Sequence, residues 1–121
     1  MYLKRIMAVA CLLTIATEAM AQQGYRIICP KGADYCDVTP IPTSRGRMHW
    51  YSGVYVSGDG DWTVRADSRS SCQAVCARES SCVLAEFYFG PERRNPVCNL
   101  FTSMQQMKWN PQGDAQVGVW E

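Results

Sequence analysis

The pattern of hydrophobic and polar positions predicts one short helix followed by a β-hairpin in the centre of the chain. Residues 72–79 tolerate a helix and overlap a capping-box start, in which Ser70 is followed by Gln73. Residues 83–89 form an apolar, aromatic-rich run that favours a strand. After a turn rich in Gly and Pro, residues 97–102 predict the return strand.

Shorter β-prone segments flank this helix and hairpin. They are residues 25–28, 53–56, 62–64 and 116–120. Residues 37–47 contain two Pro and one Gly and predict an irregular connector, and residues 103–113 predict a second one. The order of strands, one helix and further strands predicts a single α+β domain with one short helix packed on an antiparallel sheet.

Four cysteines lie on the predicted helix and hairpin. Cys72 and Cys76 are four residues apart, so their Cβ atoms would be about 5–6 Å apart on a helix, whereas a disulfide needs about 3.8 Å. Cys82 follows Cys76 closely in the sequence, and Cys72 lies one turn earlier, where it can reach Cys98 on the return strand. The spacing favours Cys72–Cys98 and Cys76–Cys82, with the crossed pairing as the alternative.

The first 21 residues have the three parts of an export signal peptide. Lys4 and Arg5 form a basic start, residues 6–15 form an apolar stretch, and residues 19–21 (Ala-Met-Ala) form a cleavage site of small residues. The apolar stretch is too short for a permanent membrane span. We therefore expect residues 1–21 to be removed, and we expect no membrane insertion of the rest.

Removal of this segment changes the charge balance and the cysteine count. The chain has 12 basic and 11 acidic residues, of which 10 and 10 would remain, so no net charge would attract nucleic acid. Cys11 would be lost, and an even number of cysteines after an export signal predicts three disulfides in an oxidising compartment, outside the cell or in the periplasm. Cys29 and Cys36 would form a local loop in an N-terminal extension of residues 22–52.

The order of these features resembles the PAN/Apple domain family. The matching features are Cys72-x3-Cys76, Cys82, an apolar strand, Cys98-Asn99-Leu100, the preceding Gly60-Asp61-Trp62 and the closing Gly118-Val119. The resemblance covers residues 53–121. It implies a disulfide-stapled fold with the pairing that the spacing favours, and a non-catalytic module for protein–protein or protein–carbohydrate contacts. Contact residues vary within the family, so the resemblance transfers no binding site.

The sequence offers little for catalysis or metal binding. His49 is the only histidine, and a nucleophilic triad would have to use it. The cysteine spacing does not match zinc sites, and residues 59–61 lack the further ligands of a calcium loop. We expect no enzymatic activity, no cofactor and no bound metal.

Binding is the remaining class of function. Trp62 and Trp120 lie on predicted strands of the family core and are expected to pack there. Aromatic side chains in the connectors can stack on a sugar ring or fill a partner's pocket, and arginines at a hairpin tip can bind a carboxylate or sulfate. The candidate ligand-binding residues are Trp50, Tyr51, Trp109, Arg93 and Arg94.

These features predict a secreted or periplasmic binding module whose partner is an extracellular protein or a glycan. The alternative is a small secreted inhibitor of a hydrolase that presents residues 90–96 as an inserting loop. A disulfide-stapled scaffold would support that role, because preorganisation lowers the entropic cost of binding.

Overall fold

The structure is a computed structural model that describes residues 23–89 and 95–121. The predicted signal peptide and the tip of the predicted inhibitory loop, with Arg93 and Arg94, lie outside the described residues. The described elements, in chain order, are β1 (Gln23–Ile28), β2 (Asp37–Pro42), β3 (Met48–Ser52), β4 (Val54–Val56), β5 (Trp62–Arg65), α2 (Arg69–Arg78), β6 (Leu84–Tyr88), β7 (Val97–Phe101), β8 (Met107–Trp109) and β9 (Gln116–Trp120).

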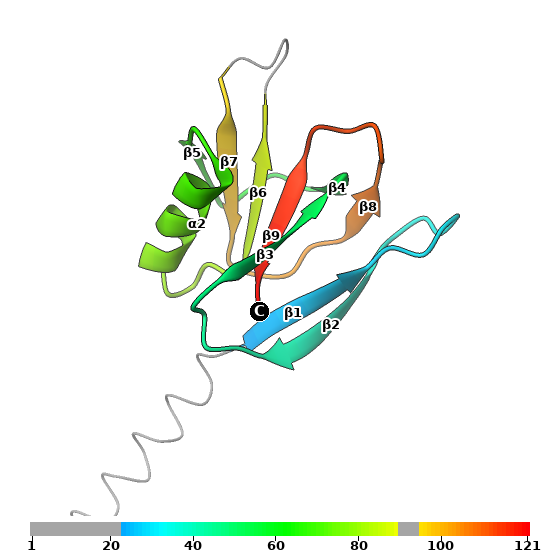
Figure 1. The fold of residues 1–121 in the computed structure, drawn as a ribbon, viewed down its shortest axis with the longest axis horizontal. Helices are drawn as coiled ribbons and strands as arrows, with labels where there is room; N and C mark the ends of the chain where they lie inside the picture. Colours follow the sequence, from blue (N-terminus) through cyan, green and yellow to red (C-terminus); the bar gives the residue numbers. More distant parts are fainter. Residues whose placement is uncertain (1–22, 90–94) are drawn as a thin grey trace, which may run out of the picture.

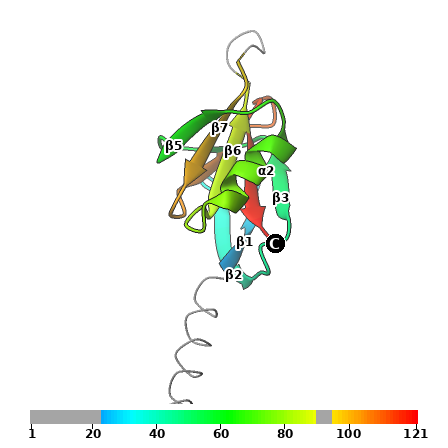
Figure 2. The same cartoon turned by 90° about the vertical axis from the view of Figure 1, so that its left-hand side faces the viewer.

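The strands form one five-stranded antiparallel sheet and two separate two-stranded ribbons. The order in the main sheet is β3-β9-β6-β7-β5, and the ribbons are β1–β2 and β4–β8. The helix α2 lies across one face of the main sheet (Figures 1 and 2). This arrangement confirms the predicted α+β class with one short helix on an antiparallel sheet.

Both faces of the central strands β9, β6 and β7 are buried, because their side chains alternate between two hydrophobic clusters. On β6, Ala85 and Phe87 belong to the cluster beneath α2, and Leu84 belongs to the cluster beneath the two ribbons. On β9, Trp120 belongs to the cluster beneath α2 and Val119 to the cluster beneath the ribbons. Burial on both faces explains why β6 is apolar on both sides apart from Glu86, instead of alternating between apolar and polar residues.

Disulfides join α2 to the rest of the fold. Cys72 bonds to Cys98 on β7, and Cys76 bonds to Cys82 just before β6. All four of these cysteines have no exposed surface. The third disulfide joins Cys29 to Cys36 at the turn of the β1–β2 ribbon. The structure therefore contains the pairs that the spacing favoured and not the crossed alternative.

The helix begins earlier than the predicted capping box. Ser68 is the N-cap, and its side-chain oxygen accepts a hydrogen bond from the N–H of Ser71 at 3.1 Å. Gln73 has a different role, because its side-chain oxygen accepts a hydrogen bond from the N–H of Met48 at 3.4 Å. The predicted start at Ser70 is therefore wrong, and Ser68 has the extended backbone that an N-cap requires.

The C-terminal end of α2 is capped by Arg45, which lies between β2 and β3. Its guanidinium donates to the carbonyl oxygens of Cys76, Glu79 and Ser80, at 3.2, 3.1 and 2.5 Å. It also lies 4.8 Å from the ring centroid of Trp120. A cation is favourable where the last helical carbonyls have no partner within the helix. Desolvation lowers the pKa of Arg45 from its usual value, but an arginine stays charged at neutral pH.

Parts of both predicted connectors form strands, so the prediction of irregular structure is wrong there. Residues 37–42 form β2 although they contain Pro40 and Pro42, which are tolerated because β2 pairs with β1 alone. Residues 107–109 form β8, which pairs with β4. Such pairing depends on contacts between distant segments, which local propensity does not show.

Strand β3 belongs to the main sheet, although the sequence placed it in the N-terminal extension. It pairs with β9 along its whole length, from Met48 opposite Trp120 to Ser52 opposite Gln116. The candidate residues Trp50 and Tyr51 therefore lie on an edge strand instead of in a connector.

We predict that replacing Cys72 and Cys98 together with alanine lowers the free energy of unfolding by about 3.5 kcal/mol, because the closed loop of the unfolded chain is released. Urea unfolding followed by tryptophan fluorescence measures this change. A loss of less than about 1 kcal/mol would contradict the central place given to this bond.

Arg45→Ala is expected to destabilise the protein by about 1–2 kcal/mol, since it leaves helix-end carbonyls without their charged donor. Arg26→Ala, at an exposed arginine on β1, is the matched control and should have little effect. Equal melting temperatures for the Arg45 and Arg26 variants would show that the cap contributes nothing.

Candidate functional site

The turn of the β1–β2 ribbon projects from the molecule on the side opposite α2 (Figure 1). The Cys29–Cys36 disulfide closes it, and the N–H of Ala33 donates to the carbonyl of Pro30 at 3.2 Å. The N–H of Cys36 donates to the carbonyl of Met107 at 2.9 Å, which attaches the turn to β8. The turn is thus fixed both within itself and against the body of the protein.

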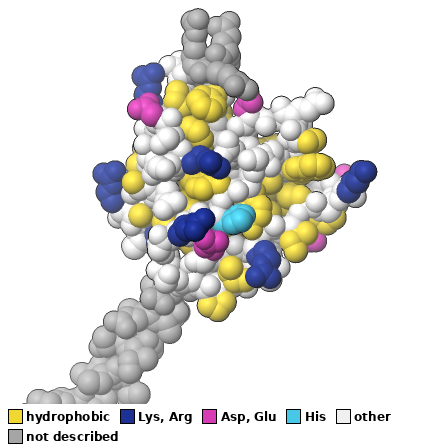
Figure 3. All heavy atoms as spheres, viewed as in Figure 1, with side chains coloured by type: hydrophobic (Ala, Val, Ile, Leu, Met, Phe, Trp, Pro, Cys, Tyr) yellow, Lys and Arg dark blue, Asp and Glu magenta, His cyan; other side chains and the backbone are white. Residues whose placement is uncertain are grey.

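A pocket of about 240 Å³ lies between this turn and Trp109. Trp109 is 50% exposed and Tyr35 is 44% exposed, and both line the pocket. They are two of the four large hydrophobic side chains that are exposed among the described residues. In Figure 3, hydrophobic side chains gather where β8 meets the β1–β2 ribbon. Exposed aromatic surface is concentrated here instead of being scattered.

Local backbone geometry holds Trp109 at this pocket. Trp109 is paired with Val54 in the β4–β8 ribbon, and the N–H of Asn110 donates to the carbonyl of Gly53 at 2.7 Å. Gly53 has a φ of 77°, and a Cβ there would lie 3.0 Å from the Asn110 carbonyl oxygen and 3.3 Å from Trp109 Nε1. Glycine at this position therefore allows the close approach that sets the indole in place.

A cation lies beside the aromatic wall of the pocket. The Nζ atom of Lys108 is 5.3 Å from the centroid of the Tyr35 ring, within the range of a cation–π contact. The residues that line the pocket include no histidine and no carboxylate. The pocket offers aromatic faces and backbone polar groups, which suit the binding of a ligand.

The other aromatic candidates lie elsewhere. Trp50 is half-buried and packs on β9, where a Cβ on Gly118 would come within 2.9 Å of its ring. Tyr51 is also half-buried, and its hydroxyl accepts a hydrogen bond from the N–H of Ile27 at 3.3 Å. These contacts favour a structural role for Tyr51, whose role in ligand binding stays a prediction.

Sequence reasoning missed Tyr35 and misplaced one tryptophan. Tyr35 is next to Cys36, in the loop that the sequence treated as a local addition, and only the contact of that loop with β8 brings it near Trp109. Trp62 was expected to pack but is 40% exposed on the edge strand β5. Trp120 does pack, at 1% exposure, and its Nε1 donates to the carbonyl of Cys82 at 3.0 Å.

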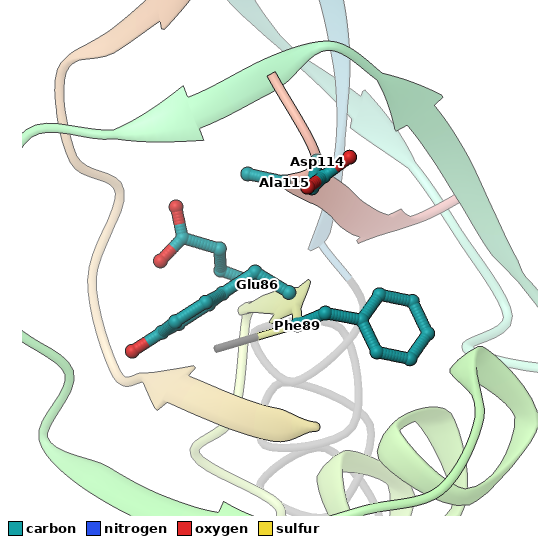
Figure 4. A pocket seen from close by; sticks show the side chains of 5 residues that line it. Glu86, Phe89, Asp114 and Ala115 are labelled. Carbon is teal, nitrogen blue, oxygen red and sulfur yellow. The ribbon is translucent and has the colours of Figure 1, made fainter. Parts of the chain in front are cut away.

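A second pocket, of about 290 Å³, contains the carboxylates of Glu86 and Asp114. Figure 4 shows that the carboxylate of Glu86, on β6, and the ring of Phe89, directly after β6, point in different directions. Glu86 is 6% exposed and accepts hydrogen bonds from the N–H of Val56 at 2.7 Å and from Asn99 Nδ2 at 3.2 Å. Both carboxylate oxygens are therefore engaged in joining β6 to β4 and β7, which is a structural role.

Two further findings concern metals and membranes. Within residues 23–89 and 95–121, no group of three or more His, Cys, Asp or Glu side chains is placed to hold a metal ion. In the same ranges, no helix has the length and apolar character needed to cross a bilayer.

A family model described as the PAN domain matches residues 47–118, which is more than half of the 121 residues. The match includes α2, Trp109 and the main sheet except the last two residues of β9, and it leaves out the β1–β2 ribbon with Tyr35. No curated protein and no solved structure matches the chain.

Replacing Cys29 and Cys36 together with serine is expected to loosen the turn while the main sheet keeps its stability. Amide hydrogen exchange should speed up at least tenfold in residues 30–36 and stay unchanged in β6, because this disulfide closes only a local loop. Unchanged exchange in the turn would show that the disulfide does not hold the pocket together.

Proposed function

Because this chain belongs to the PAN domain family, whose members generally bind proteins or carbohydrates, we propose that it is a secreted or periplasmic binding module without catalytic activity. The observation that carries the proposal is the pair of exposed aromatic side chains, Tyr35 and Trp109, facing one pocket on a disulfide-closed turn. Three disulfides support the compartment, since such bonds persist in oxidising surroundings.

The size and lining of the pocket favour a carbohydrate as the ligand. A volume of about 240 Å³ is smaller than the range of about 300–1,000 Å³ for drug-sized ligands, so it suits a single ring. The apolar face of a pyranose ring can stack on Trp109 or Tyr35, and its hydroxyl groups can bond to the backbone of the turn. We therefore propose that one sugar unit of a glycan occupies this pocket.

The rigidity of the pocket supports the proposed binding of a single sugar ring. The disulfide, the hydrogen bond from Cys36 to Met107 and the glycine at residue 53 hold both aromatic walls before a ligand arrives. Preorganisation of this kind reduces the ordering cost of binding. The inhibitor hypothesis stays a prediction, because residues 90–94 of its loop lie outside the described residues.

Screening the oxidised protein on a glycan array, followed by saturation-transfer NMR with the glycans that bind, tests this function. Trp109→Ala and Tyr35→Ala should each weaken binding about tenfold, which corresponds to about 1.4 kcal/mol for a lost aromatic contact. Trp62→Ala is the matched control, since Trp62 is also exposed but lies on β5.

Glycan binding that survives both pocket substitutions would place the site elsewhere. An array with no binding, combined with capture of an extracellular protein that depends on Trp109, would replace the sugar with a protein partner.

A further inference from the structure

The outer edge of β3 presents backbone groups that could pair with another strand. The N–H of Glu121 donates to the carbonyl of Arg47 at 3.1 Å, so Arg47 is a hydrogen-bonded position facing β9. Bonding direction alternates along an antiparallel strand, so the N–H and C=O groups of Met48 and Trp50 face outward. Within the described residues, the N–H of Met48 has the side chain of Gln73 as its acceptor, and the outward groups of Trp50 have no partner.

A groove of about 360 Å³ follows this edge. Its lining includes four consecutive residues of the chain, 47–50, and three residues of the first part of α2: Arg69, Ser70 and Gln73. This lining places the groove between strand β3 and the first part of α2, on the side of β3 where Gln73 reaches the N–H of Met48. Trp50 lines this groove, so the space that a bound peptide would need adjoins its backbone.

The groove contains a positively charged side chain, Arg69, that is not neutralised by a carboxylate within the described residues. Arg69 is exposed and makes no ion pair within the described residues, and no acidic residue lies in the first turn of α2. A cation at a helix N-terminus is unfavourable for the helix, so stability does not explain Arg69. Figure 3 shows cationic side chains and the histidine around apolar surface on this face.

Arg47 and His49 also line the groove, and their contacts with Glu121 leave some of the Arg47 N–H groups free to bind a ligand. The Nε atom of Arg47 lies 3.3 Å from a carboxylate oxygen of Glu121, and Nδ1 of His49 lies 3.6 Å from the other oxygen. The side chain of Arg47 is 83% exposed, and within the described residues its two terminal nitrogens make no hydrogen bond or ion pair. An arginine fork that is open in this way can bind a further carboxylate.

We propose that the β3 edge binds an acidic peptide in extended conformation by strand addition. The peptide backbone pairs with the outward N–H and C=O of Trp50, and carboxylate side chains of the peptide meet Arg47 and Arg69. The Trp50 ring is fixed on Gly118, so the edge is rigid before binding. The bond from Met48 to Gln73, at 3.4 Å, is long and marks one end of the added strand.

Charge alone would suit a sulfated glycan equally well, but the backbone favours a peptide. A polysaccharide has no alternating N–H and C=O groups to match those of Trp50. This inference does not depend on the proposed sugar pocket, which lies at the β1–β2 turn and shares no lining residue with the groove.

NMR titration of the oxidised, isotope-labelled protein with three synthetic peptides tests the inference. The first probe is an acetylated peptide of alternating Glu and Val, the second is the same peptide with alternate backbone nitrogens methylated, and the third has Lys in place of Glu. The first should shift the amide signals of residues 48–52 and slow hydrogen exchange at Trp50. The methylated and the Lys peptides should bind at least tenfold more weakly.

Variants separate this site from general charge attraction. Arg69→Ala should weaken binding of the Glu-Val peptide about two- to fivefold, the effect expected for an exposed ion pair. Arg78→Ala, in the last turn of the same helix, is the matched control and should leave binding unchanged. Trp109→Ala should also leave it unchanged, so a failure of the sugar pocket and a failure of the β3 edge are distinguishable.

Equal binding of the methylated and unmethylated peptides would overturn strand addition. Equal loss in the Arg69 and Arg78 variants would overturn the groove as the site. Binding of a sulfated dextran oligosaccharide at residues 47–50, with no binding of the Glu-Val peptide, would replace the peptide with an anionic glycan.

Discussion

The bond between buried sulfur atoms is the constraint on which this fold depends. The helix α2 buries only two residues, Cys72 and Cys76, and both are in disulfides. A helix normally adheres to a sheet through a stripe of large apolar side chains, which α2 lacks. Under the chain-entropy model the two bonds contribute about 3.5 and about 2.4 kcal/mol, which is a large share of the roughly 5–15 kcal/mol that stabilises a typical domain.

The large apolar side chains are consequently supplied by the sheet and the ribbons. Trp120, Phe101 and Leu84 are each at most 1% exposed, and they come from three neighbouring strands of the main sheet. The opposite face of that sheet is covered by the β4–β8 and β1–β2 ribbons. This leaves the β1–β2 turn and the β3 edge at the periphery, where side chains can be exposed without weakening either cluster.

Local patterns in the sequence were sufficient to predict the helix and the hairpin, and they favoured the observed disulfides over the crossed pairing. The four-residue spacing of Cys72 and Cys76 constrains pairing on any helix, and the apolar run of β6 has few other interpretations. The strand β2 could not be predicted, because its prolines are tolerated only where the strand has one neighbour. The cap at the end of α2 was equally hidden, since Arg45 is far from Cys76 in the sequence.

At the candidate sites, too, single residues could be identified from the local sequence, whereas their neighbours in the fold could not. Trp109 was identified because it lies in a predicted connector, but Tyr35 joins it only through the contact between Cys36 and Met107. Trp50 was identified as an exposed aromatic residue, whereas the structure packs its ring on Gly118 and turns its backbone toward an open edge. Which residues share a site is a property of strand pairing, and strand pairing is set by the whole fold.

Mass-spectrometric mapping of the disulfides in the protein purified from its own cells, without reduction, tests the central claim most directly. The account predicts peptides linked through Cys72–Cys98, Cys76–Cys82 and Cys29–Cys36, with no free thiol among these six residues. A free thiol at Cys72 or Cys76, or peptides joined in the crossed pairing, would contradict it.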